Sequence, residues 1–433
     1  MDISITNLGY SIKLNSIDSM MLKEIKDELT VKPELLNKNY LNTDVESFEV
    51  YRVSKNSIYI PRYYGISKFK NTQGLKSENL TDTVPFNGVL RELQNTTIEA
   101  TMKTYSEYGG GLVSLDTGLG KTVVALKLIS MVNKKTLIIV HAQFLLEQWL
   151  ERINTFLPTA RVGIIRQDVC DYSDKDIVVG MLQSIIKREY PKECMKSFGH
   201  LIIDEVHHIG SKTFSSIFFK VQCEYMLGLS ATPERKDGLS KIIYWFLGPQ
   251  IVDIKRTTDK PTIKHVFTEI DNTYIERYNR QGVINSSSMI TDLTLNHNRN
   301  ELIISEILLQ LKESRKILVL SHRRAHCEYL YSLLKSKTVN CGLYLGGMKT
   351  ESRNETTKTD VILGTYQASG EGFDVPELDT LILSTPKSDI QQAVGRILRQ
   401  KNNNIPIVVD IVDLFSIFKG QHYSRKKYFK LIN

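Results

Sequence analysis

Cysteines are few in this chain, and none stands in a pattern that would bind a metal or build a disulfide framework. The five cysteines (Cys170, Cys194, Cys223, Cys327 and Cys341) are scattered over 433 residues, and no two form a Cys-x-x-Cys pair. We therefore expect neither a disulfide framework nor a zinc site. Buried, reduced thiols in a reducing compartment are the expected alternative.

Long apolar runs are also lacking. The first thirty residues hold no basic segment followed by an apolar one, and no window approaches the roughly 20 apolar residues that span a bilayer. We therefore expect a soluble, intracellular protein with no membrane partner. Neither sign of charge dominates, since the formal net charge is +8. This modest basic excess suits a polyanionic partner but does not establish one.

The composition is that of a globular protein with several domains. Apolar residues make up 41% and charged residues 24% of the sequence, values typical of chains that fold over most of their length. A length of 433 residues exceeds what one ordinary core accommodates, so two to three domains are expected.

Short aliphatic runs alternate with longer segments of helical period in two regions. The expected strands of the first region are Leu112–Leu115, Thr136–Val140, Ile177–Val179, Leu201–Ile203 and Met226–Ser230. Those of the second region are Ile317–Leu320, Cys341–Tyr344, Val361–Thr365, Thr380–Leu383 and Pro406–Ile411. Strands that are apolar throughout are typical of parallel sheets covered on both faces. Their alternation with helices predicts an α/β fold class with two successive doubly wound domains.

The N-terminal part differs from these regions. Residues 1–84 mix polar and charged residues with short β-rich runs such as Phe48–Val53 and Ser57–Pro61. Such runs indicate short strands of a separate sheet. We expect a small α+β accessory module here.

The remaining boundaries follow from the alternation. We expect the first parallel-sheet domain over residues 85–250, a connector over 251–300 and the second domain over 301–433. We expect the tail Lys419–Lys430 to form a helix. Its basic face, which includes Arg425, would be exposed to solvent or contact phosphates.

A glycine-rich loop joins the expected strand Leu112–Leu115 to a helix expected at Val123–Met131. Its glycines would let backbone N–H groups turn toward phosphates, and the helix N-terminus would add its dipole to the same anion site. In such a loop the lysine reaches the β/γ oxygens and the following hydroxyl ligates magnesium. The residues expected to form this nucleotide site are Thr117, Gly118, Gly120, Lys121 and Thr122. Leu115 departs from the usual small residue at the first position of the pattern.

Two adjacent carboxylates follow the apolar run Leu201–Ile203. An acidic pair at the end of a buried strand is costly unless a cation takes up its charge. Asp204 is placed to hold magnesium, and Glu205 would polarise the attacking water as general base. A solvated acidic loop is the alternative. His207 is expected to relay between a nucleotide site and a nucleic-acid site rather than to bind metal.

The motifs resemble those of superfamily 2 helicases and translocases of the DExH class, and they follow that family's order from about residue 90 to 412. The resemblance implies two tandem RecA-like domains, ATP and Mg²⁺ as cofactors, and a nucleic-acid partner. It implies that Gln94, in Leu90–Gln94, contacts the adenine base. It also implies that Ser230 and Thr232 couple hydrolysis to strand movement.

The second domain carries the matching half of the pattern. The segment from Gly364 to Asp374 resembles the motif that touches the nucleic-acid backbone and, through Asp374, the ribose. Gln392, Arg396 and Arg399 match the arginine-finger motif, and they fall on one helix face. Such an arginine stabilises the charge on the γ-phosphate by a factor of roughly 10³–10⁵. The two domains would then have to close during hydrolysis.

Polar residues after strands lie where the family grips nucleic-acid phosphates. These candidates are Gln143, Gly180, Ser184, His322, Arg323 and Thr365. Hydroxyls, amides and arginines suit backbone contacts that position a strand without reading its sequence. A plain surface role is an equal alternative for each of them. Trp149, on the helix expected at Gln143–Phe156, is expected in the core rather than as a stacking platform.

A closer resemblance is to the XPB-like branch of double-stranded-DNA translocases and to helicases of large DNA viruses, including poxvirus transcript-release, asfarvirus and giant-virus relatives. It is carried by the phosphate loop, by Gly228–Pro233, by the ending Val408–Asp413 and by Ser57–Gly65. It implies an ATP-dependent helicase or translocase on DNA that works in a viral transcription or repair complex, in the host-cell cytoplasm or virion, with no oligomer required for activity. An RNA helicase and an assembly subunit with weak ATPase activity are the alternatives.

Overall fold

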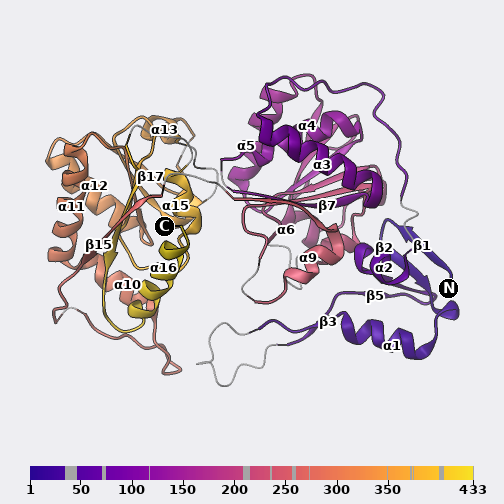
Figure 1. Ribbon diagram of the computed structural model, residues 1–433, viewed down its shortest axis with the longest axis horizontal. Coiled ribbons are helices and arrows are strands. Elements are labelled where there is room, and N and C mark those ends of the chain that lie inside the picture. Colours follow the sequence, from indigo (N-terminus) through magenta and orange to yellow (C-terminus); the bar gives the residue numbers. More distant parts are fainter. Residues whose placement is uncertain are drawn as a thin grey trace. The chain divides into compact units, whose positions relative to one another are not determined.

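The computed structural model describes residues 1–34, 46–70, 75–116, 118–207, 215–234, 237–255, 260–272, 274–348, 350–370, 373, 375–398 and 404–432. The chain divides into two compact units, Met1–Arg256 and Thr257–Asn433. Figure 1 shows that each unit is built around its own sheet. In the described residues no helix is both long and apolar enough to cross a membrane.

The first unit begins with a small antiparallel sheet. Its strands are β1 (Ile3–Thr6), β2 (Gly9–Lys13), β6 (Ser57–Ile60) and β5 (Arg52–Val53), in that order. Further elements of this module are η1 (Leu14–Ser16), α1 (Ser19–Glu28), the paired strands β3 (Thr30–Val31) and β4 (Phe48–Glu49), and α2 (Arg62–Phe69). The alternating residues Tyr10, Ile12, Ile58 and Ile60 fill its core.

Helix α2 joins this module to the rest of the first unit. The buried Arg62 donates to the Cys223 carbonyl at 2.8 Å, and the Tyr63 hydroxyl donates to the Tyr108 carbonyl at 3.0 Å. Gly65 is required because a Cβ there would lie 2.3 Å from Cγ of Tyr10. The Pro-aromatic run around residue 61 therefore forms a close-packed contact between the N-terminal module and the rest of the first unit.

The large sheet of the first unit is parallel except at one edge. Its order is β10-β9-β11-β8-β12-β13-β7-β14, with only β10 antiparallel to its neighbour β9. The strands are β7 (Gly110–Leu115), β8 (Thr136–Val140), β9 (Val162–Arg166), β10 (Val169–Cys170), β11 (Ile177–Met181), β12 (His200–Ile203), β13 (Tyr225–Ser230) and β14 (Gln250–Ile254). The continuous burial of β7, β8 and β12 matches a sheet covered on both faces.

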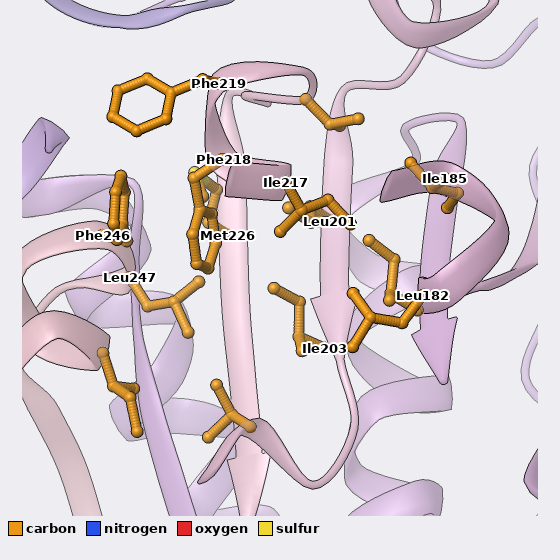
Figure 2. Packing of buried hydrophobic residues seen from close by; sticks show 14 of the residues in the cluster. Leu182, Ile185, Leu201, Ile203, Ile217, Phe218, Phe219, Met226, Phe246 and Leu247 are labelled. Atoms are coloured by element: carbon orange, nitrogen blue, oxygen red, sulfur yellow. The ribbon is translucent and has the colours of Figure 1, made fainter. Parts of the chain in front are cut away.

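Helices cover both faces of this sheet. Cores on the two sides take residues from α3 (Glu92–Tyr108), α4 (Lys121–Val132) and α5 (Gln143–Phe156), and from α6 (Leu182–Lys187), α7 (Lys192–Lys196), η3 (Ser216–Phe219) and α9 (Ser240–Leu247). Figure 2 shows the second of these cores, where Phe218 stacks on Phe246 with ring centroids 4.4 Å apart. Leu201 and Met226 reach the same core from β12 and β13.

The second unit has an all-parallel sheet of order β15-β20-β19-β16-β18-β17. Its strands are β15 (Thr262–Phe267), β16 (Ile317–Ser321), β17 (Cys341–Tyr344), β18 (Val361–Thr365), β19 (Thr380–Leu383) and β20 (Ile407–Val412). Its helices are α10 (Ser286–Leu295), α11 (His297–Lys312), α12 (Arg324–Ser336), α13 (Thr350–Thr356), α14 (Tyr366–Gly370), α15 (Gln391–Ile397) and α16 (Phe418–Ile432). The two α/β sheets confirm the predicted fold class.

Two features differ from the sequence expectations. The connector expected over 251–300 is divided between the units, because β14 completes the first sheet and β15 pairs with β20 in the second. The tail is helical as expected, but Arg425 is not solvated. It is buried with Nε 2.8 Å from Oδ1 of Asp410, because an inward-facing carboxylate requires a partner.

Candidate functional site

The polar residues singled out in the first unit lie along one edge of its sheet. Strands β7, β8, β11, β12 and β13 are parallel, with Met181 opposite Val140 and Ser230 opposite Ser114. Their carboxyl ends therefore meet at the same edge, the usual ligand site of open α/β sheets. The register places the phosphate loop, the acidic pair and Ser230 together.

The phosphate loop turns through two glycines with left-handed backbone, Gly118 at φ 84° and Gly120 at φ 95°. Gly120 precedes α4, so Lys121 and Thr122 lie in the first turn of that helix. The Lys121 ammonium donates to the Leu115 carbonyl at 3.0 Å. The lysine thus folds back on its own loop, at the place where a phosphate would be held. Thr117 lies outside the described residues.

Gln94 is tied to the same loop. Its amide donates to the Leu119 carbonyl at 3.3 Å and accepts from the Arg91 backbone N–H at 2.9 Å. A Cβ on Gly120 would lie 2.2 Å from the Gln94 amide nitrogen, so the glycine leaves room for this side chain. Arg91 adds a bond from its guanidinium to the Gly118 carbonyl at 3.3 Å. Gln94 therefore packs on the phosphate loop, and its contact with the base stays a prediction.

Asp204 follows β12 and faces the loop. Burial raises the pKa of Asp204 to about 6, the negative charge of Glu205 adds to the rise, and the positive charge of Lys121 opposes it. The Asp204 carboxylate also accepts from the Trp149 indole N–H at 2.9 Å. A carboxylate held at this cost suits a cation, and with the Thr122 hydroxyl it offers the oxygen donors that Mg²⁺ prefers.

Glu205 begins a chain of contacts that continues through His207 and Ser230 to Thr232. Its backbone is left-handed at φ 48°, an uncommon conformation for this residue type. One carboxylate oxygen lies 3.4 Å from Nδ1 of His207, and that nitrogen lies 3.1 Å from the Ser230 hydroxyl. The Ser230 oxygen in turn accepts from the Thr232 backbone N–H at 3.1 Å. The structure thus brings together the four residues for which base and coupling roles were predicted.

The second unit places its candidates on α15. Gln392 is half-buried, whereas Arg396 is only 5% exposed and donates to the Phe373 carbonyl at 2.6 Å. Arg399 and Asp374 lie outside the described residues. The predicted finger arginine is therefore held inside its own unit in this structure.

The nucleic-acid candidates all stand at or just beyond the carboxyl ends of parallel strands. Gln143 and Ser184 are internally bonded: Gln143 donates to Glu147 at 3.0 Å, and Ser184 accepts from the Gln167 backbone at 2.9 Å. Gly180 is buried in β11, and a Cβ there would lie 2.7 Å from Ile185. These residues lie at the same edge of the sheet as the phosphate loop, on the far side of β12 and β13, and Gly180 gives close packing there rather than a donor.

The candidates in the second unit follow β16 and β18. His322 Nδ1 lies 3.0 Å from the Thr385 hydroxyl, and burial lowers its pKa to about 4. Arg323 donates to Ser287 at 2.6 Å and to Thr291 at 2.9 Å, and Thr365 accepts from the Ala368 backbone at 3.2 Å. Arg323 keeps α10 in place.

Trp149 has a role that the sequence reasoning missed. It is 1% exposed, as expected for a core residue, but its indole N–H donates a hydrogen bond to Asp204. The signal was available, because a buried indole N–H requires an acceptor. Trp149 is therefore a positioning residue for the Asp204 carboxylate as well as part of the core.

Comparisons with known proteins show which families the chain matches. The family described as "Type III restriction enzyme, res subunit" matches residues 87–235, and "Helicase conserved C-terminal domain" matches residues 298–401. A candidate ATP-dependent RNA helicase of Acanthamoeba polyphaga mimivirus is 37% identical over 443 residues, which cover 98% of this chain and 85% of the relative. One of African swine fever virus is 28% identical over 357 residues, covering 76% and 69%.

The crystal structure of T4 UvsW aligns with 100% of this chain and 97% of its own, at a TM-score of 0.40 and 17% identity. So loose a likeness carries no argument. The mimivirus relative, in contrast, is similar over almost the whole chain, the N-terminal module included. The chain belongs to the superfamily 2 helicases, which are nucleic-acid-dependent ATPases, among the helicases encoded by large DNA viruses.

Proposed function

We propose that the residues at the carboxyl ends of the parallel strands in the first unit hydrolyse ATP. The contacts from Glu205 to Thr232 then couple this hydrolysis to movement along nucleic acid. The observation that carries this proposal is the continuous path from Glu205 through His207 to Ser230 beside the phosphate loop. Contiguous side-chain contacts of this kind can carry the coupling of hydrolysis to movement.

Each residue has a role in this scheme. Lys121 exchanges the Leu115 carbonyl for the β/γ-phosphate oxygens, and the N–H groups at the start of α4 face the same anion. Glu205 accepts the proton of the attacking water, a step in which a positioned base contributes roughly 10²–10⁴-fold. Asp204 and Thr122 would hold Mg²⁺, which when bound neutralises charge on the phosphates. Gln94 and Thr117 complete the nucleotide contacts.

The arginines of the second unit retain their proposed role as stabilisers of the γ-phosphate charge. Arg396 would have to give up the Phe373 carbonyl before it could contact a phosphate. We infer that Arg396 serves hydrolysis only after such a release, with Gln392 and Arg399 assisting in the same motif and Asp374 contacting the ribose.

We favour duplex DNA as the track. The XPB-like features at Gly228–Pro233 and Val408–Asp413 support DNA, as does the Asp-Glu-Val-His box in place of Asp-Glu-Ala-Asp. RNA is the second candidate, since the mimivirus and African swine fever virus relatives carry the names of ATP-dependent RNA helicases. In either case we expect Gln143, Ser184, His322, Arg323 and Thr365 to meet the backbone.

The test is the ATPase rate of the full chain with a panel of single- and double-stranded DNA and RNA of matched length, at fixed salt. Stimulation mainly by duplex DNA supports the first choice, and stimulation by RNA alone overturns it. No stimulation by any track contradicts the motor and fits an assembly subunit with weak ATPase activity. The Glu205→Gln variant, assayed beside the wild type, measures contaminating hydrolysis. Binding should weaken steeply with salt, because phosphate contacts release counterions.

A further inference from the structure

A largely buried group of two histidines and one aspartate lies in the second unit, and none of the three residues has been assigned to ATP or nucleic acid. It consists of His265, Asp410 and His422, whose candidate ligand atoms all lie within 4.8 Å of one another. We propose that this group is a binding site for one Zn²⁺ ion.

The fold builds the group from three separate segments. His265 and Asp410 are register partners on the adjacent parallel strands β15 and β20, so their side chains share one face of the sheet. His422 comes from α16, which packs on that face through Phe429. Residues 265, 410 and 422 are far apart in sequence, which is why motif reading found no metal-ligand spacing and predicted no zinc site.

The distances suit a tetrahedral ion. His265 Nδ1 lies 3.1 Å and His422 Nδ1 lies 3.4 Å from the same oxygen, Oδ2 of Asp410. Ligands about 2.0–2.1 Å from a zinc ion at tetrahedral angles are about 3.3 Å apart. Two imidazole nitrogens and one carboxylate oxygen form a donor set that suits zinc better than Mg²⁺ or Ca²⁺. With three protein ligands, the fourth position belongs to water.

Hydrogen bonds alone do not satisfy every buried polar atom of this group. His422 is 4% exposed, and its Nδ1 has no hydrogen-bond partner although it lies 3.4 Å from Oδ2 of Asp410. A buried polar nitrogen without a partner costs free energy, and a metal ion would satisfy it. The His265 side chain is 26% exposed, so an ion can reach the site from solvent.

Arg425 orients the carboxylate from the other side. Its Nε lies 2.8 Å from Oδ1 of Asp410, and its NH1 donates to the Lys387 carbonyl at 2.9 Å. The guanidinium therefore occupies one carboxylate oxygen and leaves Oδ2 to the histidines. Partners of this kind behind a ligand are usual at metal sites.

Bound zinc would fasten the edge strand β15 and the C-terminal helix α16 to the central strand β20. Such an ion is structural: it raises the stability of the second unit and takes no part in ATP hydrolysis. The proposal is therefore independent of the function assigned to the first unit.

The test uses the full chain, stripped of metal with a chelator and titrated with Zn²⁺ alone in excess Mg²⁺, which saturates the oxygen-ligand sites. Calorimetry or dialysis with metal analysis should give one tight Zn²⁺ per chain. His265→Gln and His422→Gln should each weaken this binding at least about ten-fold. His297→Gln, at an exposed histidine on α11, is the matched control and should bind like the wild type.

Two further measurements keep the result decisive. Co²⁺ in place of Zn²⁺ should give an intense visible spectrum in the wild type that His265→Gln abolishes. Zn²⁺ should raise the melting temperature of the wild type but not of His265→Gln, whose partly exposed side chain makes a folding defect easy to exclude by circular dichroism. Absence of tight binding in the wild type, or equal binding in His265→Gln, overturns the site.

Discussion

Two aspartates occupy equivalent positions in the two units, each directly after a buried parallel strand, yet their surroundings are opposite. Asp204 follows β12 and is met by an indole N–H and a second carboxylate, with the cation of Lys121 nearby. Asp413 follows β20 and is met by Arg299 through two bonds, Nε to Oδ1 at 2.8 Å and NH2 to Oδ2 at 3.0 Å. Asp204 is therefore placed to bind a cation, whereas Asp413 is already paired with the Arg299 guanidinium.

This difference separates an acid that can take part in catalysis from one that stabilises the fold. Thr268 and Tyr274 also donate to Asp413, and Arg299 donates to the Ser384 carbonyl, so the charge of Asp413 is compensated within the second unit. The segment Val408–Asp413, which resembles a family motif, thus contains two buried acids, Asp410 and Asp413, that stabilise the second unit. An acid at a strand end predicts a site only where the fold supplies no arginine for it.

The largest effect should come from Glu205→Gln. It removes the proposed base but keeps the shape, so kcat should fall by roughly 10²–10⁴-fold while nucleotide affinity and the melting temperature stay near wild type. Steady-state ATPase and nucleotide-binding assays measure both. Glu151→Gln, at an exposed glutamate on α5, is the control. Wild-type turnover in Glu205→Gln would contradict the assignment.

Arg299→Met should act on stability instead. It leaves Asp413 as an unpaired buried charge, which should cost about 3–5 kcal/mol in the free energy of unfolding. Urea unfolding followed by fluorescence measures it. The double variant Arg299→Met with Asp413→Leu should recover much of this loss, since neither charge then stays buried alone. A small loss in the single variant would mean that water reaches Asp413.

The raised pKa of Asp204 predicts a pH dependence. Magnesium requires the ionised carboxylate, which in the free chain predominates only above about pH 6. Apparent Mg²⁺ affinity should therefore fall about five-fold from pH 6 to pH 5. For folding the sign is opposite: the cost of the buried charge is full above about pH 6 and disappears as pH falls toward the ordinary value of 3.8.

Trp149→Phe refines this prediction. The indole bond favours the ionised form of Asp204, so its loss should move the midpoint of the Mg²⁺ affinity profile to higher pH. Titrations of magnesium-dependent ATPase at several pH values provide the midpoint for wild type and variant. An unchanged midpoint in a folded variant would mean that Trp149 serves packing alone.

Ser230→Ala should have the smallest effect. It removes one neutral hydrogen-bond partner of His207, a loss of about 0.5–1.5 kcal/mol. We expect basal hydrolysis to persist and stimulation by nucleic acid to drop about two- to ten-fold. Ser106→Ala, at an exposed serine bonded within α3, is the control. An equal loss of basal and stimulated rates would contradict a coupling role.

The strands of both sheets were largely predictable, because runs that are buried on both faces must be apolar throughout. Four of them, Thr136–Val140, Cys341–Tyr344, Val361–Thr365 and Thr380–Leu383, have the predicted bounds. The strands β9, β10, β14 and β15 were not predicted. Their burial is partial or mixed, so their sequences lack the continuous apolar signal.

The sequence by itself determined the phosphate loop, because glycines at 118 and 120 followed by Lys121 leave few other uses for that turn. It also determined the adjacent acids Asp204 and Glu205 and the α/β class, since these depend on neighbours along the chain. Only the tertiary structure decided which acids stay available and which are paired, and only it joined His265, Asp410 and His422. The physical reason is that charge compensation depends on distance in space, which strand register and helix packing set between residues far apart in sequence.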